Sequence, residues 1–561
     1  MILIDDLPQE LIDNISSFLS VSDLSKTLTI SPKFQIAAES CSRGFEKFTI
    51  TEANADKFLS TYGGRRVRYL RRIRFMPMFP SLDTPLPEGT SPPCRDSASA
   101  IVHADEHFTS QIQTLFGILD SLQSKMKDSD FGDSIRLTIY TPRRLAPHYC
   151  LHRTYVSWRV HLLAPETLPT VKFIRTLVIK NGRHSNLLDS DIDQEKPSLR
   201  SLDLRILKDL GSKLPALQKI ICKVGAEDWV SYVKWEAHTA NHYRHIFEGP
   251  QRDSRHSFAN AASQIQCKDL RDLDLDFMSP IHVIDWTDQR IAMPDLVTPA
   301  LHDPFSTALR VLSYPIRRLN LRGVFDDTLF WPRDTSEVMP HWPNLEILHV
   351  AFHPVSPTGA WYFRGVHEPD SVEGGFEITP AHYPPYETSP EDEEVDGDDD
   401  NYIEWDQISE AQYRVVPNDE LIEPFLTAFA RATDAMPSLK VAAVWSILQL
   451  MASDMGGVYA TEDYKNFGSR KLGWGVVYSA PGFGDSRCGL EVQQSANRQL
   501  WWKVANWRPT PRLKELIQGI GETEHKSDLK EYWNEAADWQ SLDDRRSFED
   551  ITESYFSRTV A

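Results

Sequence analysis

The chain has 561 residues, of which 41% are hydrophobic and 11% aromatic, and this composition excludes wholesale disorder. Its formal net charge of −20 argues against the phosphate backbone of a nucleic acid as a main partner. The chain is too long for one ordinary domain, unless it forms a repeat architecture that grows by adding units.

Cysteine usage and hydropathy predict an intracellular protein. Six cysteines are scattered along the chain without a Cys-x-x-Cys pair, which is typical of a reducing compartment. Asp5 and Asp6 stand where a signal peptide would be basic, and no apolar run approaches the ~18 residues that suffice to span a membrane. We therefore expect a cytoplasmic or nuclear location, or both, and no membrane partner.

The first 40 residues predict three short helices. One of the two aspartates before Leu7 serves as the N-cap of the first helix, and Pro8 fits its first turn. Apolar residues then follow at spacings that place them on one helical face: Leu11, Ile12, Ile15, Phe18 and Leu19. Ser22 is expected to cap the second helix and Ser31 the third. Three such helices make a very small core, so a neighbouring domain or a partner protein must cover their apolar faces.

This N-terminal segment resembles an F-box. The resemblance covers residues 5 to about 45 and rests on residues that agree with the family in order and spacing: Leu7-Pro8-x-Glu10-Leu11, Ile15, Leu19, Asp23-Leu24, Ile30-Ser31 and Phe34. The chain departs from the family at one place, because many F-boxes end in a Trp and this chain has only Phe45 and Phe48 there. Without the family, the segment is interpreted as an amphipathic hairpin packed on the main body.

An F-box docks on the Skp-type adaptor of cullin–RING ubiquitin ligases. The resemblance therefore implies a three-helix F-box over residues 1–48 that binds this adaptor and, through it, a cullin. It implies that the following residues contact the adaptor: Leu7, Pro8, Ile15, Leu19, Leu24 and Ile30.

The remainder of the chain, residues 49–560, carries a recurring six-residue pattern with apolar residues at positions 1, 4 and 6. Positions 4 and 6 alternate with polar residues, as a half-buried strand requires. The pattern begins at residues 70, 174, 199, 217, 270, 316 and 345. A proline precedes several of these segments, and a further one at residue 439, by two residues, where it ends a helix and favours an extended chain: Pro197, Pro215, Pro343 and Pro437.

These units resemble leucine-rich repeats, in which each repeat adds one strand to a parallel sheet and returns through a helix or loop. The family places Asn or Cys at template position 9, whereas this chain has other residues there, such as Gly182 and His353. We therefore expect an α/β fold in which the F-box is followed by an irregular, leucine-rich-repeat-like solenoid with long insertions. A non-repeat α/β domain is the alternative.

Two stretches are expected to interrupt this body. Residues 77–99 are proline-rich and predict a surface loop. Residues 380–405 contain eight acidic side chains between positions 391 and 400, which predicts a disordered acidic loop, either a solvated insertion or an electrostatic lure for a basic partner. After it, residues 421–432 predict a helix and residues 472–478 a strand, so residues 436–507 are expected to continue the folded body.

An arginine-rich run spans residues 65–74, with six arginines in ten residues. One interpretation is a nuclear-import or RNA-binding patch. The interpretation that we favour is the polar face of the first sheet strand, with Leu70, Ile73 and Phe75 buried beneath it.

One string has the spacing of a catalytic metal site. His103, Glu106 and His107 form H-x-x-E-H, which on a helix places two histidines on one face with a glutamate as base for a zinc-bound water. No third ligand stands out, and the apolar residues that follow predict an ordinary amphipathic helix. The chain also lacks a Gly-x-Ser-x-Gly elbow, a phosphate loop and a dinucleotide fingerprint. We therefore predict no enzyme activity, no metal and no cofactor.

The resemblance implies a substrate-recognition subunit of an SCF-type ubiquitin ligase, with the F-box on the adaptor and the repeat body on a target protein that the sequence does not name. The alternative is an interaction scaffold that works outside any ligase. A zinc hydrolase that uses His103, Glu106 and His107 is the third hypothesis.

Overall fold

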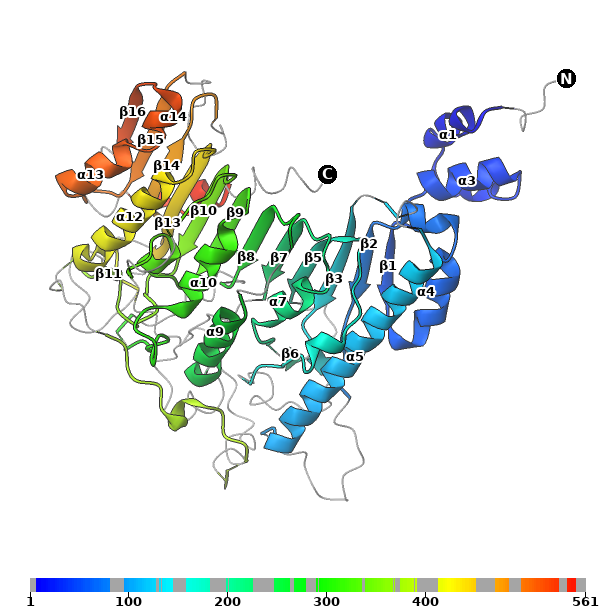
Figure 1. The fold of residues 1–561 in the computed structure, drawn as a ribbon, viewed down its shortest axis with the longest axis horizontal. Helices are drawn as coiled ribbons and strands as arrows, with labels where there is room; N and C mark the ends of the chain where they lie inside the picture. Colours follow the sequence, from blue (N-terminus) through cyan, green and yellow to red (C-terminus); the bar gives the residue numbers. More distant parts are fainter. Residues whose placement is uncertain are drawn as a thin grey trace.

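The structure is a computed structural model. It describes the following residues: 7–80, 95–127, 131–132, 134–144, 158–181, 198–199, 201–224, 247–262, 267–278, 289–290, 292–334, 339–366, 368, 374–387, 389–390, 412–450, 470–483, 496–533 and 542–550. The fold is mixed α/β, with a large and mostly parallel sheet along one side of which the helices of the body lie (Figure 1). Within these residues, no helix combines the length and apolar character needed to cross a membrane.

The three helices expected at the N-terminus are α1 (Gln9–Ser17), α2 (Val21–Thr27) and α3 (Pro32–Cys41). Pro8 is the N-cap of α1 and does not lie in its first turn, while the two aspartates predicted to cap it lie outside the described residues. The prediction of Ser22 as the second cap was wrong by two residues, because the Ser20 hydroxyl accepts the hydrogen bond from the Asp23 amide at 3.2 Å. Ser31 caps α3 as predicted.

The large sheet has thirteen strands in the described residues, and its strands follow one another in chain order. From β1 to β13 every pair of neighbours is parallel, and β14 and β15 then run antiparallel to the strand before them. The strands of this sheet are β1 (Lys47–Ile50), β2 (Arg72–Phe75), β3 (Ile135–Tyr140), β5 (Ile174–Lys180), β7 (Lys219–Lys223), β8 (Asp272–Asp276), β9 (Arg318–Gly323), β10 (Ile347–Phe352), β13 (Val441–Leu450), β14 (Arg470–Ser479), β15 (Arg498–Lys503), β16 (Leu529–Trp533) and β17 (Asp543–Asp544), the last of which pairs with β14.

Strand register places the predicted template positions side by side. Position 4 of one strand pairs with position 4 of the next, and position 6 does the same, so two buried apolar rows cross the sheet. The position-4 row from β2 to β10 is Ile73, Leu137, Leu177, Ile220, Leu273, Leu319 and Leu348. The position-6 row is Phe75, Ile139, Ile179, Cys222, Leu275, Leu321 and Val350.

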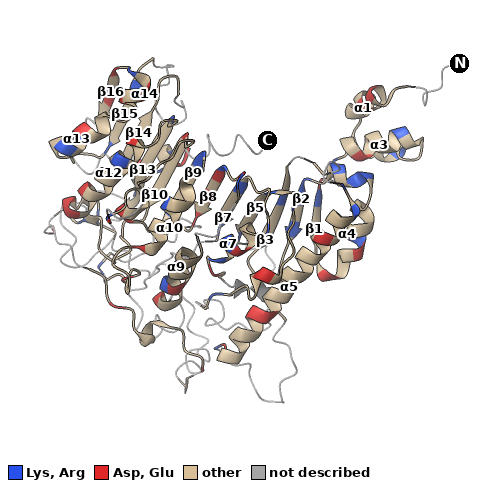
Figure 2. Ribbon diagram, in the orientation of Figure 1, with Lys and Arg blue, Asp and Glu red and all other residues tan. Residues whose placement is uncertain are grey.

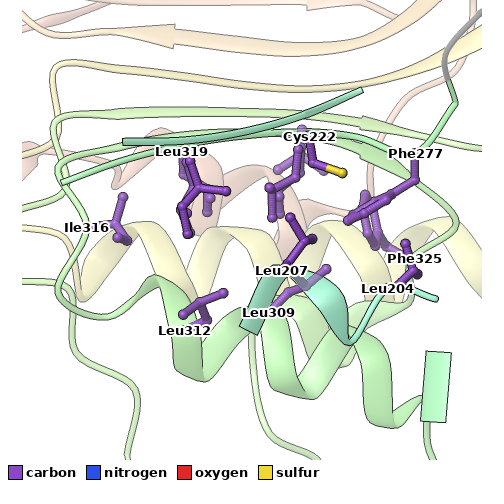
Figure 3. Close-up of a cluster of buried hydrophobic side chains, with 14 of the residues drawn as sticks. Leu204, Leu207, Cys222, Phe277, Leu309, Leu312, Ile316, Leu319 and Phe325 are labelled. Atoms are coloured by element: carbon purple, nitrogen blue, oxygen red, sulfur yellow. The ribbon is translucent and has the colours of Figure 1, made fainter. Parts of the chain in front are cut away.

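Both rows pack in one continuous core with the helices of the body. In the middle of the sheet, Leu204 and Leu207 near α7 and Leu309 and Leu312 of α10 meet these strands (Figure 3). The helices of the body are α4 (Ala55–Tyr62), α5 (Ala98–Lys125), α7 (Ile206–Gly211), α9 (Glu248–Ala262), α10 (Pro304–Ser313), α12 (Asp419–Asp434), α13 (Pro511–Gln518) and α14 (Glu522–His525), with short 3₁₀ helices that include η3 (Arg65–Tyr69), η7 (Asp327–Leu329) and η8 (Pro380–His382).

One predicted repeat strand was wrong. Residues 199–204 do not enter the large sheet, because β7 pairs directly with β5 and leaves no position between them. Instead, β6 (Ser198–Leu199) forms a two-stranded sheet with β4 (Arg143–Arg144), and Leu202 forms an isolated bridge with Val160. A second two-stranded sheet joins β11 (Phe363–Arg364) to β12 (Val416–Pro417).

The two predicted interruptions are shorter than expected where the structure describes them. The proline-rich loop stops at Ser97, which caps α5, so residues 98 and 99 are helical. At the second interruption, η8 and Tyr383 pack on α9, where the Tyr383 hydroxyl donates to Asp253 at 2.8 Å. The acidic run 391–400 lies outside the described residues. The helix and strand predicted after it are α12 and β14.

Candidate functional site

The N-terminal helices bury very little of their apolar surface. Their core consists of Ile12, Phe34 and Ala37, with Leu7 packed against it half-buried. A set of large apolar side chains within 20 residues stays exposed, and we call this set the apolar surface: Leu11, Ile15, Phe18, Val21, Leu28 and Ile30. Exposed apolar residues gathered at this density are typical of a docking site for another protein.

The first helix explains why these side chains remain uncovered. Its predicted apolar face is wider than the single neighbour that packs on it, because α3 covers only the row that contains Ile12 and Ser16. Leu11, Ile15 and Phe18 follow a second row at spacings of four and three residues, and this row has no cover among the described residues. The predicted apolar face of the helix is therefore divided between a row that α3 covers and a row that remains exposed.

The six residues expected to contact an adaptor fall into three groups. Ile15 and Ile30 belong to the apolar surface, and Pro8 is also exposed. Leu7 and Leu19 are half-buried. Leu24 is buried inside the helical unit, so its place is structural. Sequence reasoning left Phe18, Val21 and Leu28 out of the site, although their spacing beside Ile15 was visible.

A buried carboxylate attaches this helical unit to the body. Glu39 of α3 lies within 2.5 Å of the Arg66 guanidinium and 3.2 Å of that of Arg65, both in η3. Burial alone would raise the pKa of Glu39, but the hydrogen bonds and charges of the two arginines outweigh it and hold the pKa below its usual value. The start of the arginine-rich run is therefore a junction and not the polar face of a strand. The first strand is β1, and the run reaches the sheet only at β2.

The face of the sheet opposite the buried apolar rows is polar, and we call it the polar face. Strand register places nine Lys or Arg residues there against three Asp residues, an excess of six positive charges in a chain whose net charge is −20. The cations are Lys47, Arg72, Arg74, Arg136, Lys180, Lys219, Lys223, Arg318 and Arg322, and the carboxylates are Asp272, Asp274 and Asp276. Figure 2 marks the charged residues of these strands.

The positive charge is unevenly compensated along the polar face. On β8 and β9, Asp272 accepts two hydrogen bonds from Arg318 at 2.9 and 3.0 Å, and Asp276 lies 3.8 Å from Arg322. On β1 to β3, by contrast, no described carboxylate lies within ion-pair distance of Lys47, Arg74 or Arg136. Burial and the neighbouring Arg72 lower the pKa of Arg136, which shows that like charges crowd this end of the face.

Four side chains on adjacent strands form a hydrogen-bonded ladder across the middle of the polar face. The Trp445 indole donates to His349 Nε2 at 3.0 Å, His349 Nδ1 lies 2.8 Å from Asn320 Oδ1, and the Asn320 amide donates to Asp274 at 2.7 Å. Because Nε2 accepts the indole proton, Nδ1 carries the proton and donates it to Asn320. Burial, together with the charge of Arg322, lowers the pKa of His349 to about 3, so the imidazole is neutral.

At the end of the ladder, a small apolar cluster closes the C-terminal part of the same face. Phe548 stacks on Trp445 with ring centroids 4.8 Å apart. Gly473 of β14 makes room for it, since a Cβ atom there would lie 2.7 Å from the Phe548 ring. The part of the polar face that remains polar and uncompensated is therefore the β1–β3 end.

The neutral His349 predicts a pH dependence of stability, to which His353 adds another, because burial also lowers the pKa of His353 to about 3. The folded-state pKa of His349 lies below the ordinary value, so only the unfolded chain takes up a proton as the pH falls below about 6.5, and the folded state loses about 2 kcal/mol between pH 7 and pH 5. Asp326, whose pKa burial raises to about 7, acts in the opposite direction in the same range. We therefore expect the stability advantage of the wild type over His349→Gln, measured by urea unfolding, to shrink by about 2 kcal/mol at pH 5. An advantage that is equal at both pH values would contradict the assignment.

The H-x-x-E-H string lies in the first half of α5. His103 Nδ1 is 3.7 Å from Glu106, and both side chains point into solvent, while His107 Nε2 lies 3.0 Å from the Met78 carbonyl. Nothing in the described part of the chain adds a third ligand, because no group of three or more His, Cys, Asp or Glu residues there has a metal-binding arrangement. The string is therefore explained as the polar face of an amphipathic helix.

Comparison with known proteins adds no family to these observations. No protein-family model matches the chain, and no match is found among curated proteins. A proposal about function therefore rests on the residues and their geometry.

Proposed function

We propose that this protein is the substrate-recognition subunit of an SCF-type cullin–RING ubiquitin ligase. The observation that carries the proposal is the apolar surface, which the small helical unit leaves uncovered beside a buried core of its own. Its residues lie in the segment whose order and spacing resemble an F-box, and a Skp-type adaptor is the partner that this resemblance implies. Docking would remove these side chains from water, which is favourable by about 25 cal/mol per Å² of apolar surface.

The body would then hold the target protein. We propose that it is an irregular, leucine-rich-repeat-like solenoid, a fold whose strands present one continuous surface to a partner. The uncompensated cations at the β1–β3 end of the polar face favour an acidic segment of the target. The same end of the sheet adjoins the N-terminal helices through the junction at Glu39, so adaptor and target would be held on one side of the molecule.

By this proposal the chain performs no chemistry. It raises the effective concentration of the target near the ubiquitin-loading enzyme, which converts an encounter in solution into one within a complex. Its contributions are the two binding surfaces and the junction that holds one relative to the other.

Affinity capture with two substituted chains tests the proposal. The wild type should retain a Skp-type adaptor, a cullin and a target whose abundance rises when the proteasome is inhibited. Arg74→Glu combined with Arg136→Glu should retain the adaptor and lose the target, whereas Ile15→Asp combined with Phe18→Asp should lose the adaptor and retain the target. The proposal would be overturned if the wild type retained neither adaptor nor cullin. Partners whose abundance does not change when the proteasome is inhibited would indicate a scaffold outside any ligase.

A further inference from the structure

A polar pocket opens on the helix side of the sheet, away from both surfaces proposed to bind proteins. Its volume is about 460 Å³, which lies in the range of small-molecule sites. It is lined by residues beside and within α7 and α9 and by one proline: Arg205, Lys208, Arg252, Asp253, His256, Ser257, Asn260, Ala261 and Pro299. We call it the α7–α9 pocket.

Lys208 is the feature of this pocket that most needs an explanation. Only 3% of its surface is exposed, yet its ammonium group has no hydrogen bond or ion pair with any residue that the structure describes. The nearest acid in sequence, Asp209, lies 3.3 Å from the Arg205 guanidinium, and its charge also acts on Lys208. Burial nevertheless outweighs the charge of Asp209 and lowers the pKa of Lys208, so a ligand that supplies more negative charge would stabilise the ammonium form.

The other polar groups of the pocket complement the same kind of ligand. Three cations, Arg205, Lys208 and Arg252, line the pocket together with one carboxylate, that of Asp253. Because Asp209 beside the pocket pairs with Arg205, an excess of one positive charge remains. The Asp253 carboxylate is already occupied, because it accepts hydrogen bonds from Arg252 at 3.1 Å and from the Tyr383 hydroxyl at 2.8 Å.

Two more donors have no partner in the described part of the chain, namely the Ser257 hydroxyl and the Asn260 amide. They follow one another on α9 at a spacing of three residues, which places them on one side of the helix. A tetrahedral oxyanion accepts several hydrogen bonds from charged and neutral donors at once, and this set of groups provides both kinds.

We propose that the α7–α9 pocket binds a small organic phosphate. A phosphate group matches the Lys208 ammonium, the guanidinium groups and the two neutral donors that line the pocket, and the volume leaves room for an organic part beside it. The position between α7 and α9, on the side of the sheet opposite the polar face, separates this ligand from the proposed target. The proposal does not depend on the ubiquitin ligase function.

Calorimetric titration of the full chain tests this site. The probes are ribose 5-phosphate and inorganic phosphate, with sodium chloride at matched ionic strength as the reference. The wild type should bind ribose 5-phosphate saturably, and Lys208→Met, which keeps the apolar stem and removes the charge, should bind it about tenfold more weakly or worse. The matched control is Lys213→Met, because Lys213 lies just after α7 and donates to the Glu166 carbonyl outside the pocket. Its affinity should equal that of the wild type.

A second variant keeps the test decisive if Lys208→Met does not fold. Asn260→Asp places a carboxylate at an exposed position of the pocket and should abolish phosphate binding without disturbing the buried lysine. Tighter binding of ribose 5-phosphate than of inorganic phosphate would support an organic ligand, and preference for inorganic phosphate would overturn that part of the proposal. Heat that sodium chloride reproduces, or equal affinity in the wild type and both pocket variants, would overturn the site itself.

Discussion

Replacement of Arg255 by Met is expected to lower the free energy of unfolding by about 3–5 kcal/mol, the usual cost of breaking a buried ion pair. Arg255 of α9 and Asp303, the N-cap of α10, are both fully buried, and their side chains lie 2.7 Å apart. The same guanidinium donates to the Val324 carbonyl at 3.1 Å and stacks 4.4 Å from the ring of Phe305. The substitution therefore leaves a buried carboxylate without its cation and removes a contact between two helices of the body.

The carboxylate left behind would not be rescued by its neighbour. Asp326 lies beside Asp303 and accepts from its amide at 3.4 Å, and burial together with the charge of Asp303 raises the pKa of Asp326 to about 7. Two carboxyl groups in one buried site repel each other when both are ionised, so losing Arg255 makes the site worse for each.

Urea unfolding followed by tryptophan fluorescence measures this effect, with Arg317→Met as the matched control. Arg317 is paired with Glu346 at 2.6 Å, but it is exposed to solvent, so its replacement should cost at most about 1 kcal/mol. Similar losses in the two variants would show that burial does not set the strength of the Arg255 pair.

The strands show how far a local pattern predicts this fold. The six-residue pattern located β2, β5, β7, β8, β9 and β10, because the two apolar positions that it records are the ones that form the buried rows. It missed β3, because template position 1 of that segment is Ser134 and not an apolar residue. β1 was also not identified, although Phe45, Phe48 and Ile50 occupy the three template positions. For β3, pairing with the apolar rows of β2 and β5 supplies what the segment itself lacks, and a pattern that is searched along one segment contains no information about neighbouring strands.

The candidate site was predicted less completely for the same reason. The charge of the polar face exists only once the register is known, since Lys47, Arg72 and Arg136 are 25 and 64 residues apart in the chain and adjacent in the sheet. The arginine-rich run, which is conspicuous in the sequence, is divided between the junction to Glu39 and the polar face. The α7–α9 pocket has no signal in the sequence, because its donors come from separate elements.

The apolar surface is expected to contribute strongly to adaptor binding. Replacing Ile15 and Phe18 by Asp is expected to weaken binding of a Skp-type adaptor about 100- to 10,000-fold, because two apolar contacts worth roughly 1.5–3 kcal/mol each would be lost. The stability of the chain should remain within about 0.5 kcal/mol of the wild type, since both side chains are already in water in the free protein. Binding of the full-length chain in solution to surface-immobilised adaptor measures the affinity, and urea unfolding measures the stability.

The chain offers a closely matched control for this experiment. Leu301 and Val311 are 92% and 46% exposed, against 83% for Phe18 and 43% for Ile15, and they lie in the body. Changing both to Asp should leave the adaptor affinity unchanged. Leu24→Ala separates surface from core, because Leu24 is buried and its loss should destabilise the helical unit by about 2–5 kcal/mol. Equal adaptor affinity for the wild type and the Ile15 and Phe18 variant would show that the apolar surface does not bind the adaptor through these two side chains, and would contradict the observation on which the proposed function rests.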